Sequence, residues 1–466
     1  MASVSAFWER HPGSSILAKP MADHMRIGSE SMNGEITSAE DVAEGHRGYR
    51  DLLSSPGATR VVVAQILGPT ADGMWSLGII LIALTIFHSP LLAGAVALCN
   101  QTGVFFAPVA GALVDRFGCK RLIVIDYAVT AGLLTTIAAL LGEGKLGIPA
   151  FLALTTAGAL TSQLSAVALR TIFPQMFGGE LLDRANALTF TTRSAARTVA
   201  PAITGALIAY ASAPIAVAST AALYLISATV VVGYRDATIQ PLGEAAHVGR
   251  EIVEGLRYSW VNPVVRRVGI FTAVAFFGWG AVFGAVPVFI QSTLHGGAML
   301  TGIVFAVFGI VGVATGPLSG RLNTGGREGR MLFVCAMIAG LSLLALGIAA
   351  SVTVMFLAIV ALGLVETPVD QTAYSVRQRY CAPEMENRVR AVGMAIDYFA
   401  CGIGIFASAA LAGRNAPATL IAFGCWVLGA SLLGPWACSA AARNRVDRLG
   451  ITDTPAAADL ISSEAR

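Results

Sequence analysis

Seven ionisable side chains of this sequence stand inside long apolar stretches. They are Asp72, Asp126, Arg193, Arg197, Glu366, Asp370 and Asp397. Inside a membrane, a charge at the centre of a helix costs roughly 2.5–3.5 kcal/mol on insertion scales. Such residues therefore face the interior of a helical bundle, where they pair with one another or bind ions and substrates. They are the first candidates for chemistry in this chain.

Asp72 is the main candidate for proton coupling. It precedes Gly73 and follows Gly68 and Pro69 closely, and these residues let a helix bend. A partly desolvated carboxyl group in such a place can take up and release a proton. The alternative is a structural acid that only accepts hydrogen bonds.

Two acids and two arginines are each spaced by four residues, which places each pair on one face of a helix. Glu366 and Asp370 flank Pro368, and together they could hold a shared proton or attract a cationic ligand. Arg193 could recognise an anionic group of a substrate, whereas a structural role is favoured for Arg197. The open alternative is a structural partnership between these acids and these arginines.

Three uncharged side chains are further candidates for a substrate cavity: Gln163, Trp75 and Trp279. Gln163 is accompanied only by hydroxyl side chains in its apolar stretch, until Arg170. The two tryptophans could line an aromatic pocket together with nearby phenylalanines. The alternative for both is packing against other helices or lipid.

The stretches that carry these residues are long enough to cross a membrane. Of the 466 residues 55% are hydrophobic and 13% are charged, against about 45–50% and about 25% in soluble domains. A spanning helix needs roughly 20 mostly apolar residues, and an open sheet would leave backbone groups unpaired in lipid. Twelve stretches qualify: 61–87, 91–114, 122–141, 148–169, 185–210, 214–234, 268–290, 298–318, 331–350, 352–375, 390–411 and 418–440. The sequence predicts an all-α membrane protein with twelve transmembrane helices.

Lysine and arginine are concentrated in alternate connections, with Lys145 and Arg414 as the main exceptions. The positive-inside rule then places both termini in the cytoplasm. A weak repeat relates residues 111–116 to residues 316–321, which predicts two six-helix bundles with a substrate site between them. The predicted parts are a disordered cytoplasmic tail (1–47), an N-terminal bundle (48–234), a cytoplasmic linker (235–267), a C-terminal bundle (268–442) and a second tail (443–466).

The linker contains apolar residues at every fourth position. Val248, Ile252, Leu256 and Trp260 form this stripe, and Arg250 lies off it. The pattern is typical of an amphipathic helix that lies along the inner membrane surface. The alternative is a polar linker.

Residues 111–121 read Gly-Ala-Leu-Val-Asp-Arg-Phe-Gly-Cys-Lys-Arg and follow the second predicted span. They resemble the signature G-x-x-x-D-R-x-G-[RK]-[RK] of the major facilitator superfamily, although Cys119 replaces one basic residue. The resemblance implies the two-bundle fold and an inner gate. The gating candidates are Gly111, Asp115, Arg116, Gly118, Lys120 and Arg121, joined by Asp126, Asp397 and Arg197.

Further short motifs, among them residues 170–174, 197–201 and 254–257, resemble the branch of macrolide-efflux and enterobactin-export proteins. That resemblance implies a bacterial inner-membrane exporter that is driven by the proton gradient. Two departures from the pattern of drug antiporters are present, and the second weakens the implied antiport without removing it. The fourth helix lacks an arginine that drug antiporters often carry, and the motif G-P-x-x-G-G appears as Ala-Pro-Ala-Ile-Thr-Gly-Ala over residues 200–206.

No motif for nucleotide binding, metal binding or nucleophilic catalysis has the context that it needs, so we expect no cofactor, no metal and no enzymatic activity. The net charge of +3 gives no case for nucleic acid. The expected partners are a small-molecule substrate, protons and membrane lipids, and a monomer suffices. The leading hypothesis is a proton-coupled exporter that works by alternating access. An importer or lipid flippase of the same fold, or a non-transporting membrane sensor or assembly protein, is the alternative.

Overall fold

The computed structural model describes residues 57–176, 180–234, 248–320, 326–348, 351–382 and 385–439. These residues are helical or lie in short connections, and the described part contains no strand. Both predicted tails and part of the predicted linker lie outside the described residues.

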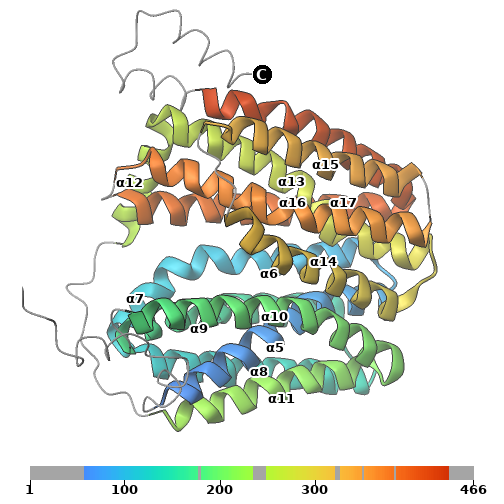
Figure 1. The fold of residues 1–466 in the computed structure, drawn as a ribbon. Helices are drawn as coiled ribbons and strands as arrows, with labels where there is room; N and C mark the ends of the chain where they lie inside the picture. The colour runs from blue at the N-terminus through green and yellow to red at the C-terminus, as the bar shows by residue number, and fades with distance from the viewer. Residues whose placement is uncertain are drawn as a thin grey trace, which may run out of the picture. The chain divides into compact units, whose positions relative to one another are not determined.

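The first half of the described chain contains six membrane-length passes. They are α5 (Ala58–Thr85), the broken pass α6 (Pro90–Gln101), η1 (Thr102–Phe106) and α7 (Ala107–Phe117), then α8 (Cys119–Gly142), α9 (Ile148–Met176), α10 (Glu180–Tyr210) and α11 (Ala213–Val232). The short helix α12 (Val248–Val261) follows. The second half consists of α13 (Pro263–Ser292), α14 (Gly297–Gly320), α15 (Glu328–Ile348), α16 (Val352–Arg379) and α17 (Glu386–Ser431) (Figure 1).

The prediction of an all-α membrane protein with twelve passes is confirmed. Ten helical segments of the described chain are long and apolar enough to span a membrane. α10 is not among them, because Arg193 and Arg197 lie within its apolar part and its first turns are charged as well, but it has the length of a span. α17 counts once although it bends at Asn415, where φ is −156° and ψ is 98°, just before Pro417. With α10 added and α17 taken as two passes, the count is twelve.

Successive passes run in opposite directions, so the helix ends lie at two opposite ends of the bundle. We call the end at which α12 lies the α12 end. The helices that begin there are α5, α8, α10, α13, α15 and α17. At the α7–α8 connection, Gly118 adopts φ 84°, and its N–H donates to the carbonyl of Val114 at 2.8 Å. A positive φ favours glycine, so Gly118 of the predicted gate has a clear structural reason for its identity.

Helices of the first half pack mainly on one another, as do helices of the second half, and two lines of contact join the halves. α10 packs on α14, and α6 packs on α17. A β-carbon on Gly205 would lie 2.7 Å from the carbonyl oxygen of Ala298 and 2.8 Å from the Cα of Gly302. Since real β-carbons do not come this close to backbone, the two glycines permit the approach of α10 and α14 far from the α12 end.

The contact between α6–α7 and α17 keeps partly exposed apolar side chains. Near mid-height, the rings of Phe105 and Phe399 meet edge to face with centroids 5.2 Å apart. About one helical turn closer to the α12 end, Val109 and Ile396 continue these faces and are 45% and 42% exposed.

Candidate functional site

Asp72 lies in the middle of α5, and its closest described partner is a tyrosine from α11. The hydroxyl of Tyr224 donates a hydrogen bond to Oδ1 of Asp72. Tyr224 is buried, whereas Asp72 is exposed. Since α5 packs against α6, α10 and α11 and touches α13 and α14, we infer that this exposed side faces the space between the halves. The hydroxyl of Ser76 also donates to the carbonyl of Asp72 at 2.8 Å.

A second carboxylate lies deeper in the same half. Asp126 of α8 is only 1% exposed, and the hydroxyl of Thr130 donates to its Oδ1 at 3.2 Å. The hydroxyls of Thr161 and Ser165, on α9, also interact with Asp126. In the low-dielectric interior these hydroxyls replace the water that an ionised carboxylate loses.

Two tyrosines lie near the two carboxylates: Tyr224 is hydrogen-bonded to Asp72, whereas the hydroxyl of Tyr127 makes no hydrogen bond to either acid. The rings of Tyr127 and Tyr224 lie 5.5 Å apart, and the charge of Asp72 acts on both tyrosines and on Asp126. Gly68 borders the hydroxyl of Tyr127 so closely that a β-carbon there would collide with it. We call Asp72, Asp126, Tyr127 and Tyr224 the paired-acid cluster.

Arg193 of α10 is half-buried and interacts electrostatically with Asp72 and with Tyr127. The structure therefore brings a predicted cavity residue and the predicted proton-coupling residue together. The side chain of Arg197 lies outside the described part of the structure, so its expected structural role stays a prediction.

In the second half, Glu366 and Asp370 lie on α16 as predicted for one helical face. Asp370 is exposed and Glu366 is half-buried, and both act electrostatically on Cys401 of α17. A carboxylate oxygen of Glu366 lies beside Gly312 of α14, 3.4 Å from the place of a β-carbon. The hydroxyl of Thr367 donates to the carbonyl of Gly312 at 3.2 Å. These acids thus lie where α16 meets α14 and α17.

The predicted aromatic residues differ in position. Trp75 is 7% exposed and belongs to the apolar core of the described chain. Trp279 is half-buried and lies 6.4 Å from Phe308, centroid to centroid, and Phe308 in turn contacts Phe283. Gln163 is half-buried on α9. Packing therefore accounts for Trp75, while Trp279 stays a candidate for the cavity.

The predicted gating residues lie around the turn between α7 and α8 at the α12 end. Asp115, Arg116 and Arg121 are exposed, whereas Gly111 and Lys120 are half-buried. The guanidinium of Arg116 lies 5.3 Å from the ring centre of Phe117. Their role in gating stays a prediction.

Asp397 has its described partners within the second half of the chain. Its Oδ2 accepts from Nη1 of Arg377 at 2.9 Å, and its Oδ1 accepts from the hydroxyl of Thr272 at 2.7 Å. The same arginine also donates to the hydroxyl of Thr272. This triad links α13, α16 and α17 and gives Asp397 a structural role, while its role in gating stays a prediction.

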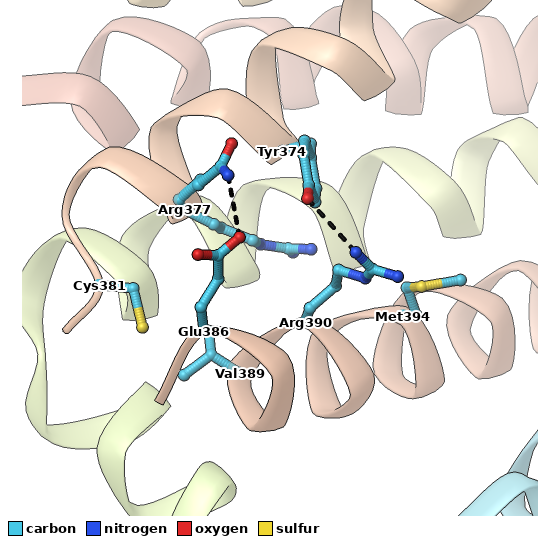
Figure 2. A pocket seen from close by; sticks show the side chains of 8 residues that line it. Tyr374, Arg377, Cys381, Glu386, Val389, Arg390 and Met394 are labelled. Atoms are coloured by element: carbon cyan, nitrogen blue, oxygen red, sulfur yellow. Dashed lines mark hydrogen bonds between the residues drawn. The ribbon is translucent and has the colours of Figure 1, made fainter. Parts of the chain in front are cut away.

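A small cavity adjoins this triad at the α12 end (Figure 2). Arg377, Cys381, Glu386 and Arg390 are among the residues that line it. Within it, Gln378 donates to Glu386 at 2.9 Å, and Arg390 donates to the hydroxyl of Tyr374 at 3.4 Å. The cavity measures about 40 Å³, whereas sites for drug-sized ligands measure about 300–1,000 Å³. It is too small to be the substrate site.

Sequence reasoning missed the hydrogen-bond partners Tyr224, Thr272 and Arg377 of the acids and their neighbour Tyr127. Tyr224 had a signal, because a buried phenol usually finds a hydrogen-bond partner. Arg377 lies just beyond the predicted span 352–375, whereas in the structure it belongs to the last turn of α16. The pairing itself has no local signal, since Tyr224 follows Asp72 by 152 residues.

The fold and these buried charges define a multi-pass membrane transporter. The family model of the Major Facilitator Superfamily matches residues 63–409, and the chain belongs to that superfamily. The resemblance of residues 111–121 to its signature is thereby confirmed at the level of the family.

Two relatives show what this chain is similar to. An uncharacterised MFS-type transporter, y4rN of Sinorhizobium fredii (strain NBRC 101917 / NGR234), is 26% identical over 368 residues, which cover 78% of this chain and 90% of that protein. The multidrug efflux pump Tap of Mycolicibacterium fortuitum is 28% identical over 200 residues, which cover 40% of this chain and 48% of that protein.

Solved structures share the fold at low sequence identity. The peptide transporter POT in complex with sulfate has a TM-score of 0.68 at 13% identity, covering 86% of this chain and 99% of that chain. The nucleoside transporter NupG has a TM-score of 0.65 at 14% identity, covering 81% of this chain and 98% of that chain. At these identities the likeness is one of fold alone.

Proposed function

We propose that this protein is a proton-coupled secondary transporter of the bacterial inner membrane, which exports a small molecule by alternating access. Membership of the superfamily supports transport, and the partial match to the efflux pump Tap supports export. The substrate class is a drug, a siderophore or another small metabolite.

The observation that carries the proposal is the paired-acid cluster. Two carboxylates in one helical bundle repel each other when both are ionised, and a proton on either one removes the repulsion. Asp72 is exposed and Asp126 is 1% exposed, so Asp72 is the group that first meets a proton from the space between the halves. Asp126 is the second carboxylate that responds to it.

Protonation of Asp72 changes the contacts between three helices. When ionised, Asp72 attracts Arg193 of α10 and accepts the hydrogen bond from Tyr224 of α11. A proton removes the charge and with it the attraction to Arg193. Loading a proton therefore weakens a link between α5 and α10, and α10 is one of the helices that contact the other half. This couples a proton to the contact between the halves.

The second half supplies the remaining part of the substrate cavity in this proposal. Glu366 and Asp370 provide negative charge, and Trp279 with Phe308 provides an aromatic surface. An arginine on one side and acids on the other are compatible with cationic, zwitterionic and anionic substrates.

The test uses purified protein in liposomes that contain a pH-sensitive dye. Lipophilic drugs and siderophore-like compounds are added to the wild type, to Asp72→Asn and to Glu143→Gln. Glu143 is the matched control, because it is a carboxylate 59% exposed in a turn far from the cluster, paired with Lys145 at 2.9 Å. We expect substrate-dependent proton movement in the wild type and the control, and its loss in Asp72→Asn.

Each other outcome has a definite meaning. Proton movement that survives Asp72→Asn contradicts the role of Asp72 and transfers it to Glu366 or Asp370. Proton movement lost in Asp126→Asn as well supports the paired-acid cluster as a unit. A wild type that moves substrates without protons contradicts proton coupling, while leaving the fold and transport intact.

A further inference from the structure

One side of α12 is apolar and exposed although the helix is firmly packed on its other side. Ile252, Val253, Leu256 and Trp260 are between 42% and 67% exposed. At 100° per residue they occupy about 100° of the helix circumference. This is the arc expected of an amphipathic helix. We call these four residues the α12 strip.

The opposite side of α12 is fixed to the turn between α16 and α17. Glu254 pairs with Arg388 at 2.7 Å, and the hydroxyl of Tyr258 accepts from the backbone N–H of Ala382 at 3.0 Å. The buried Gly255 lies against the backbone of Arg388. The described acid side chain of α12, Glu254, therefore turns away from the strip. α12 also touches α7, and the strip residues still stay between 42% and 67% exposed.

Arginines border the strip. Arg257 is exposed and lies beside Val253 on the helix circumference. The guanidinium of Arg266 lies 5.9 Å from the ring centre of Trp260 and donates to its carbonyl at 3.3 Å. An apolar surface with cationic edges matches the boundary between acyl chains and anionic headgroups.

A second pair of an arginine and a tryptophan places this boundary next to α13. Arg267 lies 5.3 Å from the ring centre of Trp436, which follows the second pass of α17 and is 39% exposed. Tryptophan is enriched where a spanning helix meets the headgroups, and arginine extends from there toward phosphates. Both pairs flank the start of α13 at Pro263, where a membrane-spanning helix begins.

We propose that the α12 strip, together with Arg257 and Arg266, is a binding surface for anionic phospholipids at the headgroup level. The apolar side chains insert between acyl chains, and the two guanidinium groups contact headgroup phosphates. Because α12 holds the α16–α17 turn through Glu254 and Tyr258, bound lipid also supports that turn. This surface is separate from the paired-acid cluster and does not depend on the transported substrate.

The test measures tryptophan fluorescence of the full chain in vesicles. The vesicles contain phosphatidylcholine and an equal fraction of either brominated phosphatidylglycerol or brominated phosphatidylcholine, since bromine quenches adjacent indoles. The chain has six tryptophans, so the difference between wild type and Trp260→Phe isolates the emission of Trp260. Trp426→Phe is the matched control: Trp426 is 47% exposed, lies on the second pass of α17 and donates to the carbonyl of Val274.

We expect brominated phosphatidylglycerol to quench the Trp260 component about twofold more than brominated phosphatidylcholine, because anionic headgroups gather at the arginines. Arg257→Gln with Arg266→Gln removes this preference, and the Trp426 component shows none. Equal quenching of Trp260 by the two lipids in the wild type overturns the proposal. Absence of quenching by either lipid also overturns it, since the strip then faces water, another protein or a second copy of this chain.

Discussion

The ion pair between Asp397 and Arg377 gives a quantitative test of how the second half is held together. Their side chains are 9% and 12% exposed, and Nη1 of Arg377 lies 2.9 Å from Oδ2 of Asp397. Thr272 bonds to both partners. Asp397→Asn would remove one charge and leave the guanidinium of Arg377 buried without its counter-ion.

The expected loss of stability follows from that burial. Removing one partner of a buried ion pair costs about 3–5 kcal/mol, since an uncompensated charge stays behind. An unfolding entropy of about 2.1 cal/mol/K per residue gives about 1 kcal/mol/K for a chain of 466 residues, so 1 kcal/mol shifts the melting temperature by about 1 °C. Asp397→Asn should therefore lower Tm by roughly 3–5 °C. The double variant Asp397→Asn with Arg377→Met should lose less stability than Asp397→Asn alone, because no buried charge remains without a counter-ion.

The assay is thermal unfolding of the purified protein in detergent, followed by circular dichroism. Glu143→Gln is the control, because its pair with Lys145 is exposed and such pairs contribute only about 0–1 kcal/mol. An Asp397→Asn protein that melts at the wild-type temperature would refute the structural role. In that case, the gating role predicted from the sequence would be the better explanation of Asp397.

Two further predictions concern the contact between the halves and the chemistry of the α12 end. Gly205→Val should widen the end far from α12, because no β-carbon fits beside Ala298 and Gly302. Spin labels on Glu143 and His295 in a cysteine-free background should then move apart, whereas Gly132→Val, where a β-carbon meets nothing within 4 Å, should leave their distance unchanged. Burial raises the pKa of the Cys381 thiol above its ordinary value, so less thiolate is present at a given pH. Alkylation of Cys381 by iodoacetamide, measured by mass spectrometry, should therefore be slower at pH 8 than alkylation of free cysteine. The rate should increase at higher pH. A rate at pH 8 equal to that of free cysteine would contradict this prediction.

Much of the fold was predictable because the backbone N–H and C=O groups of each membrane pass must form hydrogen bonds within that pass. An apolar run of sufficient length can only be a helix in lipid, so composition alone placed the passes. α10 illustrates the limit of that rule: it carries Arg193 and Arg197 and falls short of an apolar span. The sequence still predicts a transmembrane helix there, because residues 185–210 together have the length of a span.

The sequence by itself determined the number of passes, the signature turn around Gly118 and the presence of costly charges. Only the tertiary structure decided which side chains meet those charges. Tyr224 reaches Asp72 from 152 residues away, and Arg377 reaches Asp397 from a neighbouring helix. A helical period shows that two residues share one face, but the rotation of that face depends on how neighbouring helices pack. Packing joins residues distant in sequence, so the partner of a buried charge follows from the assembled bundle.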